Sequence, residues 1–222
     1  MIVSIDGGAA TGKSTIAKML SKEINFVHLN SGLLYRAVTF ILIKENFLNE
    51  SSMFYKKYFS NLELQIKGEN LNIIFYKNEN ITSHLYSQRI ANNIKYVSNN
   101  RFIREYITSI QRDLSKNINV VCEGRDIGSV VFPNADFKFF LKCDIKERVK
   151  RRYKQFINNN IVVDKKELKT MILQRDKNDI NRKNSPLKIV NDSIVIDTTR
   201  LSVEDIIKMM CEKIKEKYDK WR

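Results

Sequence analysis

The chain has 222 residues, 43% of them apolar, and a formal net charge of +14. This length suits one α/β domain with an insertion, or one large and one small domain. The apolar fraction is high enough to build a buried core. Three cysteines, Cys122, Cys143 and Cys211, are too few and too scattered for a disulfide framework or a CxxC metal site, which favours a reducing compartment. No run of about 18 apolar residues predicts a membrane span and no signal peptide is evident, so we expect a soluble, cytoplasmic protein.

The basic composition does not by itself indicate a nucleic-acid partner. The lysines are spread along the chain and often alternate with Asn and Glu. No coherent basic stripe and no strand combining aromatic and basic residues is present. A protein that binds nucleotides also needs positive charge, so we expect no nucleic-acid partner.

The first element is a short apolar strand over residues 1–5, and an amphipathic helix is predicted over residues 16–24. Between them, Gly7, Gly12, Lys13 and Ser14 have the Walker A spacing. Glycine lets the backbone approach a phosphate, and amides at a helix N-terminus favour an anion. Lys13 would reach the β and γ phosphates of a nucleotide, and the Ser14 hydroxyl is an oxygen ligand of the kind that Mg²⁺ accepts. The predicted phosphate loop comprises Gly7, Gly8, Ala9, Ala10, Thr11, Gly12, Lys13, Ser14 and Thr15.

A second buried strand is predicted over residues 26–29, followed by a helix that begins near Ser31. The apolar residues of this helix follow the 3.6-residue period. Ser31 occupies the position where an N-cap is expected, and capping would explain it fully. Capping gives no reason for Arg36 in the same helix.

From residue 61 the period changes to strict alternation, which predicts strands over residues 62–66 and 71–75, joined by a turn at Gly68. A third short strand is expected near Ile81. An antiparallel hairpin is out of place in an alternating β/α chain, so we interpret it as a small inserted subdomain.

Helical periodicity returns from about residue 97 to 114, with Arg104 near the edge of its apolar face. A strand over 118–122 then leads into Arg125 and Asp126. Later elements are a strand over 137–141, a basic helix over 144–156, a strand over 194–196 and a closing helix capped by Ser202. We interpret the arginines of the basic helix as a solvated face; they are Arg148, Arg151 and Arg152. Five strands separated by helices predict a parallel sheet with its ligands at the carboxyl ends of the strands.

The segment from 165 to 187 has an unusual pattern. An apolar stripe that includes Met171 continues at helical spacing into Arg175, Asp179 and Arg182, so polar side chains occupy the face that should point inward. One explanation is an exposed helix end in which Arg175 and Asp179 form an i, i+4 pair. The other is a mobile helical lid whose guanidinium groups neutralise charge during phosphoryl transfer.

The motifs together resemble those of the bacterial cytidylate kinases. The matching stretches are residues 7–15, 30–36, 123–133 and 175–187, with the hairpin insert in the same order, and the most specific is the run EGRDIGSVVFP at 123–133. The resemblance implies the P-loop nucleoside monophosphate kinase fold, α/β with a five-stranded parallel sheet flanked by helices. A small antiparallel β insert at about 61–83 and a helical lid at about 158–187 would complete it. The core would comprise residues 1–30 and 97–222, and the monophosphate-binding region residues 31–96.

The resemblance also implies a role for each site residue. Lys13, Arg125, Arg175 and Arg182 would be catalytic, and residues 7–15 would bind ATP, with Mg²⁺ held by Ser14 and the nucleotide. Residues at the bound CMP would be Ser31, Arg36, Arg104, Arg125, Asp126, Arg175, Asp179 and Arg182. Among them Arg36, Arg125 and Arg182 would hold its phosphate. Arg104 and Asp126 would face the base, and Arg175 and Asp179 the pentose. The stretch 197–202 resembles the family's segment near adenine.

Three positions depart from the family pattern. Asn30 stands where an aspartate is usual, Tyr86 where an arginine is frequent and Lys95 where a serine commonly touches the base. The last two bear on base discrimination and not on the type of reaction.

The function expected from this resemblance is transfer of the γ-phosphoryl group of ATP to CMP or dCMP. We expect a monomer, because no apolar heptad or further apolar segment is left over to form an interface. One alternative is another nucleoside monophosphate kinase of the same fold, because base choice rests on few residues. Another is a GTPase switch or a basic, nucleotide-dependent RNA-binding protein, although the chain has no NKxD or DxxG motif. A catalytically inactive scaffold is disfavoured, because Lys13, Ser14, Arg125, Arg175 and Arg182 are all present.

Overall fold

A computed structural model describes residues 1–158 and 161–219 of the chain. The chain forms two compact units, one of residues 1–26 and 121–222 and the other of residues 27–120. The domain boundaries expected from the sequence, with a monophosphate-binding region at 31–96 and a lid at about 158–187, stay a prediction.

The first unit contains the phosphate loop and most of the α/β layers. Its elements are β1 (Ile2–Gly7), α1 (Lys13–Glu23), β6 (Val120–Gly124), the π-helical turn η2 (Ile127–Val131), β7 (Phe137–Lys142), α6 (Ile145–Asn158), α7 (Lys165–Asn181), β8 (Ile194–Asp197) and α8 (Val203–Asp219).

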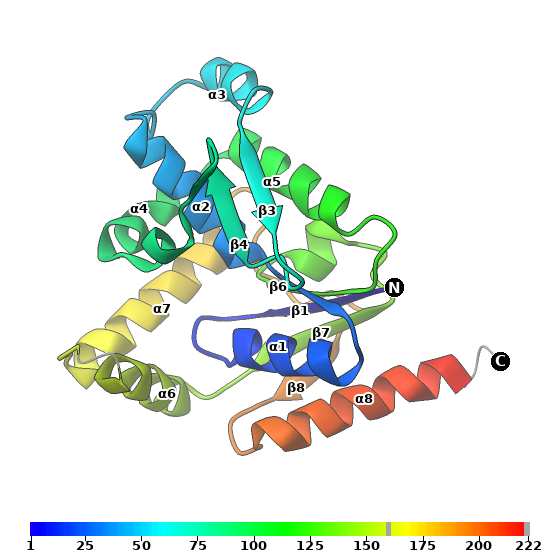
Figure 1. The fold of residues 1–222 in the computed structure, drawn as a ribbon. Coiled ribbons are helices and arrows are strands. Elements are labelled where there is room, and N and C mark those ends of the chain that lie inside the picture. The colour runs from blue at the N-terminus through cyan, green and yellow to red at the C-terminus, as the bar shows by residue number, and fades with distance from the viewer. Residues whose placement is uncertain (159–160, 220–222) are drawn as a thin grey trace. The chain divides into compact units, whose positions relative to one another are not determined.

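The central sheet has five strands, as the sequence predicted, and the structure gives their order as β2-β6-β1-β7-β8 (Figure 1). β1 pairs in parallel with β7, in a register that sets Gly7 beside Leu141, and β7 pairs in parallel with β8. The phosphate loop therefore leaves the middle strand of the sheet at its carboxyl end, which is where ligands of parallel sheets bind.

The core of the first unit is built around β1, whose residues from Val3 to Gly7 are buried. Apolar residues of α1 and α8 pack against this strand and its neighbour β7, and the two helices lie against each other (Figure 1). A strand buried on both faces is mostly apolar, and β1 and β7 fit this, with Ser4 and Lys138 as polar residues inside the apolar runs. This packing gives the loop after β1 a rigid base.

The second unit consists mainly of helices with a small sheet. Its elements are β2 (Val27–Asn30), α2 (Ser31–Lys44), α3 (Ser52–Phe59), β3 (Leu64–Lys67), β4 (Ile73–Tyr76), β5 (Glu79–Asn80), the 3-10 turn η1 (Thr82–Tyr86), α4 (Gln88–Asn99) and α5 (Arg101–Leu114). Strands β3, β4 and β5 form an antiparallel sheet, which confirms the predicted hairpin and its third short strand.

The single helix predicted from about residue 97 to 114 was wrong at its start. Residues 97–99 are the end of α4, and α5 begins at Arg101. The break is at Asn100, whose side-chain oxygen accepts from the backbone N–H groups of Phe102 and Ile103 and so caps α5. Asn is one of the residues preferred at an N-cap because its side chain satisfies amides that lack intrahelical partners. The periodicity of apolar residues runs across the break and therefore does not reveal it.

In residues 1–158 and 161–219, no helix combines the length and the apolar character that a membrane crossing requires.

Candidate active site

The phosphate loop has the backbone conformation that its glycines permit. Gly7 has a φ of +153°, and a Cβ there would lie 2.5 Å from the carbonyl oxygen of Leu141 on β7. Gly12 has a φ of +95° and directly precedes α1. Both positions thus favour glycine, because a side chain would be strained at either and would meet backbone at Gly7. Helix α1 begins at Lys13, so its N-terminal amides follow the loop directly.

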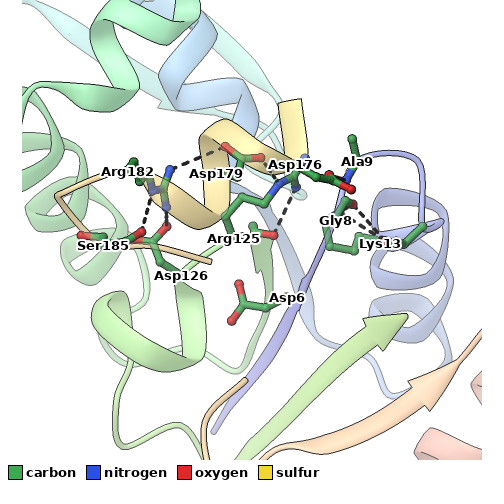
Figure 2. A network of polar contacts seen from close by, with 12 residues as sticks. Asp6, Gly8, Ala9, Lys13, Arg125, Asp126, Asp176, Asp179, Arg182 and Ser185 are labelled. Carbon is green, nitrogen blue, oxygen red and sulfur yellow. Dashed lines mark hydrogen bonds and ion pairs between the residues drawn. The ribbon is translucent and has the colours of Figure 1, made fainter. Parts of the chain in front are cut away.

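Lys13 is almost fully buried, with 5% of its surface exposed. Its ammonium group donates to the Gly8 carbonyl at 2.6 Å, which turns the side chain back over the loop (Figure 2). Burial lowers the pKa of Lys13 well below its usual value, and the positive charges of Arg125 and Arg175 lower it further. The charges of Arg125 and Arg175, from two later segments, thus act on Lys13, and the carboxylates of Glu123 and Asp6 oppose their effect on its pKa. Such a site favours an anion that relieves the repulsion between Lys13 and the two arginines.

Arg125 and Arg182 belong to a network of ion pairs beside the loop (Figure 2). The Nε of Arg125 donates to Asp179 at 2.8 Å, and Arg182 donates to Asp126 at 3.1 Å and to the Ser185 carbonyl at 2.6 Å. The Arg182 and Asp126 side chains are 5% and 4% exposed. The carboxylates hold both guanidinium groups in fixed orientations inside the protein.

The predicted lid residues lie on or next to α7, with two corrections. Met171, placed by the sequence on the apolar stripe, is 53% exposed, whereas Leu168 and Ile172 are buried. The i, i+4 explanation for Asp179 was incomplete, because this carboxylate pairs with Arg125, from 54 residues away. Arg175 has an exposed side chain that contributes to the electrostatic field at Lys13.

Asp6, at the end of β1, connects the loop to the Arg125 segment. Its carboxylate accepts from the backbone N–H of Ile127 at 2.9 Å and from that of Gly128 at 2.7 Å. Burial raises the pKa of Asp6 from 3.8 to about 6, although the two amides and Lys13 oppose the rise. Asp6 therefore fixes the turn that follows Arg125 and Asp126.

This raised pKa predicts a pH-dependent stability. A carboxyl group with a raised pKa in the folded state stabilises it below pH 4, and the contribution is lost as the pH rises through 6. A rise from 3.8 to about 6 corresponds to about 3 kcal/mol. Urea unfolding of the parent and of Asp6→Asn, without nucleotide, should show the parent losing about this much relative to the variant between pH 4 and pH 7. A difference between the two proteins that does not change with pH would contradict the assignment.

The solvated face expected for the basic helix was wrong for two of its three arginines. Arg148 is 8% exposed and donates from Nε to the Ala9 carbonyl at 2.7 Å. Arg151 donates to the carbonyls of Thr11 at 3.3 Å and of Thr198 at 2.6 Å. Both arginines bind carbonyl groups of the phosphate loop and so restrict the orientation of its peptides. Arg152, the third, is exposed over the Phe156 ring.

Thr198 lies beside the loop as well. Its hydroxyl is 3.1 Å from the Thr11 carbonyl, and Thr198 is fully buried. The 197–202 stretch, noted in the sequence only by resemblance, thus contacts the backbone of the phosphate loop.

The second unit holds the other residues expected at CMP. Arg104 is 4% exposed, donates to the Ser98 carbonyl at 3.0 Å and lies over the ring of Tyr35. Arg36 is half-buried and donates to the Leu85 carbonyl at 3.1 Å. Both guanidinium groups are thereby oriented by contacts within their own unit.

The predicted N-cap role of Ser31 was wrong. Asn30 caps α2, because its side-chain oxygen accepts from the Leu33 N–H at 3.2 Å. Ser31 is the first residue of the helix and is 4% exposed. The sequence offers two adjacent residues suited to capping, and the structure assigns the cap to the first.

Comparison with known proteins settles the family. The family model described as Cytidylate kinase matches residues 3–216. The cytidylate kinase of Fusobacterium nucleatum is 37% identical over 217 residues, which cover 97% of this chain and 98% of that protein. The cytidylate kinase of a Geobacillus strain is 35% identical over 216 residues, 97% of this chain and 96% of that protein.

The chain belongs to the cytidylate kinase family. A solved structure of an uncharacterized protein from Eubacterium ventriosum shares the fold, with a TM-score of 0.53 at 14% identity and coverage of 97% of this chain and 98% of that one. The predicted family resemblance and fold class are therefore confirmed.

Two departures from the cytidylate kinase pattern have defined surroundings in the second unit. Tyr86 is 66% exposed, and the Arg36 guanidinium carbon lies 5.3 Å from the centre of its ring. Lys95 is exposed on α4, with its ammonium over the ring of Tyr96. Asn30, the third departure, serves as a helix cap, which needs an oxygen acceptor and no charge.

Proposed function

We propose that this protein transfers the γ-phosphoryl group of ATP to CMP or dCMP, giving ADP and CDP or dCDP. The observation that carries this proposal is the convergence of positive charge on the phosphate loop. Burial lowers the pKa of Lys13, which follows a Walker A turn, and the charges of Arg125 and Arg175 lower it further against the opposing carboxylates of Glu123 and Asp6. A polyphosphate would relieve the repulsion between Lys13 and these arginines. Membership of the cytidylate kinase family indicates ATP and CMP or dCMP as the nucleotides.

ATP is expected to lie along the loop. Amides of residues 7–15 and the N-terminus of α1 would surround its phosphates, and Lys13 would turn from the Gly8 carbonyl toward the β and γ oxygens. Ser14, in the first turn of α1, is exposed and offers a hydroxyl oxygen suited to Mg²⁺. When bound with ATP, that ion would neutralise charge on the phosphates.

CMP is expected to bring its own nucleophile. Its phosphate oxygens are already charged near neutral pH, so little general-base help is needed, and catalysis consists of alignment, charge neutralisation and exclusion of water. Arg125 and Arg182 would bind the acceptor phosphate, and Arg175 the transferring group. Asp126 and Asp179, which hold those arginines, would also contact the base and the pentose.

Within the second unit, Arg36 is proposed for the acceptor phosphate and Arg104 for the base, with Ser31 near the monophosphate. The lid segment would exclude water when it closes, which limits wasteful hydrolysis of ATP. We expect the enzyme to act in the cytoplasm as a monomer.

Tyr86 and Lys95 depart from the family pattern at positions that bear on base selectivity, so base selectivity needs its own test. A coupled assay of ADP release should be run with CMP, dCMP, UMP, AMP, GMP and dTMP under identical conditions. We expect kcat/KM for CMP or dCMP to exceed that for either purine monophosphate by at least about 100-fold, because a pocket that hydrogen-bonds one base rejects others strongly. Preference for AMP, GMP or dTMP would indicate a different kinase of this fold, whereas salt-sensitive RNA binding without turnover would favour the RNA-binding alternative.

A further inference from the structure

Helix α7 is attached to the phosphate loop by more than apolar packing. Ala9 of the loop forms a small buried cluster with Val149 of α6 and with Leu168 and Ile172 of α7. Helices α6 and α7 also contact each other (Figure 1). A cluster this small is a weak attachment by itself, because burying few apolar groups contributes little.

Beside this cluster, Asp176 of α7 binds the backbone N–H of Ala9, and Arg148 of α6 binds its carbonyl. The Ala9 N–H donates to Oδ1 of Asp176 at 2.8 Å, and both residues are labelled in Figure 2. Nε of Arg148 donates to the Ala9 carbonyl at 2.7 Å. The ring is closed by an ion pair between Oδ2 of Asp176 and Nη2 of Arg148. The two side chains are only 14% and 10% exposed, so their charges interact under weak solvent screening.

The space beside Gly8 is a second observation that fits a carboxylate placed against the loop. A Cβ at Gly8 would lie 3.1 Å from both oxygens of Asp176 and 3.3 Å from Nη2 of Arg148. The absence of a side chain at position 8 is therefore what lets the pair approach the loop so closely.

The carboxylate stands next in sequence to Arg175 and three residues before Asp179. A bond that holds Asp176 against Ala9 consequently fixes the height and rotation of the helical turn that carries those residues. Asp179 in turn orients Arg125. The contact between Asp176 and Ala9 thus helps to place two guanidinium groups, those of Arg175 and Arg125.

Resting on the proposed kinase function, we propose that the Arg148–Asp176 pair latches α7 onto the phosphate loop. Asp176 is a positioning residue for transfer and not a ligand of either nucleotide. When the latch is intact, the lid arginines are aligned and water is excluded. When it is broken, ATP still binds but is transferred to CMP less often and hydrolysed more often.

A competing interpretation is that Asp176 blocks the loop by imitating a phosphate oxygen. The latch is favoured because it occupies only one amide of the loop, the Ala9 N–H. Ala9 lies four residues before the start of α1, so the other loop amides and those at the helix N-terminus stay available for the polyphosphate. The two interpretations predict opposite effects of removing the charge on Asp176.

The test compares Asp176→Asn, Arg148→Lys, the double variant and the control Lys177→Ala, an exposed neighbour on α7. Each is assayed for kcat, for KM of ATP and of CMP, and for free phosphate released per CDP formed. We expect Asp176→Asn to lower kcat roughly 10- to 100-fold, as misplacement of catalytic groups does, with KM for ATP within twofold and several-fold more phosphate per CDP. Arg148→Lys should behave alike, and the double variant should be no worse than the more severe single one, because both break the same ring.

Gly8→Ala tests the latch with its charges intact, should either polar variant fold poorly. Its methyl group would lie 3.1 Å from both oxygens of Asp176 and push the carboxylate away from Ala9 by a few tenths of an ångström, so the same rise in phosphate per CDP is expected. A kcat within twofold of the parent, with an unchanged phosphate-to-CDP ratio, would overturn the latch. A lower KM for ATP with unchanged or higher kcat would establish the blocking interpretation instead. Failure of the parent protein to form CDP would refute the proposed function, independently of the variants.

Discussion

Replacing Lys13 with methionine or alanine should lower kcat by roughly 10²- to 10⁴-fold, in line with the loss of other charge-stabilising donors. The Lys13 ammonium donates to the Gly8 carbonyl of the loop, and it would move to the β and γ oxygens as charge develops there. The same substitution should leave the free energy of unfolding unchanged or raise it. The reason is that a buried ammonium repelled by Arg125 and Arg175 is itself a cost to the folded state.

Steady-state kinetics with CMP and urea unfolding would measure both effects. Lys18→Met is the matched control, because Lys18 is on the same helix with its side chain exposed. The control should keep kcat within twofold of the parent. A Lys13 variant with activity within twofold of the parent would refute the role of this lysine in transfer. Loss of activity together with a clear fall in the free energy of unfolding would show that Lys13 is needed for folding instead.

Replacing Arg182 with glutamine should produce two large losses at once. Its guanidinium is bound to the buried carboxylate of Asp126, and removing one member of a buried ion pair costs roughly 3–5 kcal/mol of stability. The proposed contact with the acceptor phosphate would also be lost, and arginines that neutralise a phosphoryl group contribute about 10³-fold or more to kcat. Arg125 remains bound to Asp179 in this variant and should preserve part of the activity.

Arg152→Gln is the control for this prediction, since Arg152 is an exposed arginine with the same charge. It should change neither kcat nor Tm measurably. Arg182→Lys separates the two losses, because it keeps the charge but not the planar fork that contacts Asp126 and Ser185. Full activity in Arg182→Gln at a temperature where it stays folded would remove Arg182 from the transfer step.

The phosphate loop and the sheet were predictable from local sequence because their signals are local. Gly7, Gly12 and Lys13 have a fixed spacing that serves one geometry, and buried strands read as short apolar runs. The Arg125–Asp126 pair followed from its place at the end of a strand. Such signals need no knowledge of which segments meet in space.

The contacts that hold the loop were not predictable in this way. Arg148 and Arg151 are three residues apart on a helix rich in basic residues, and the pattern does not tell which arginines face the protein. Nothing in the local pattern around Asp176 indicates that its carboxylate meets Ala9, 167 residues away. The one usable signal was that α6 follows β7, the strand beside β1, so the first turns of α6 start at the same edge of the sheet as the loop.

Helix boundaries were a second limit. Asn30 and Ser31 are both good N-caps, and only the backbone conformation of Asn30, which is extended, decides between them. At Asn100 the apolar period continues through a capped break. Hydrophobic periodicity reports the buried face and not the hydrogen bonds that end a helix.

The central claim is that the phosphate loop and the arginines around it move a phosphoryl group from ATP to CMP. The most direct test incubates the protein with CMP, Mg²⁺ and ATP that carries a radioactive γ-phosphorus, and separates the products. We expect the label in the β-phosphate of CDP, formed in equal amount to ADP and dependent on CMP. Label found only in inorganic phosphate, with CMP unchanged, would contradict the account.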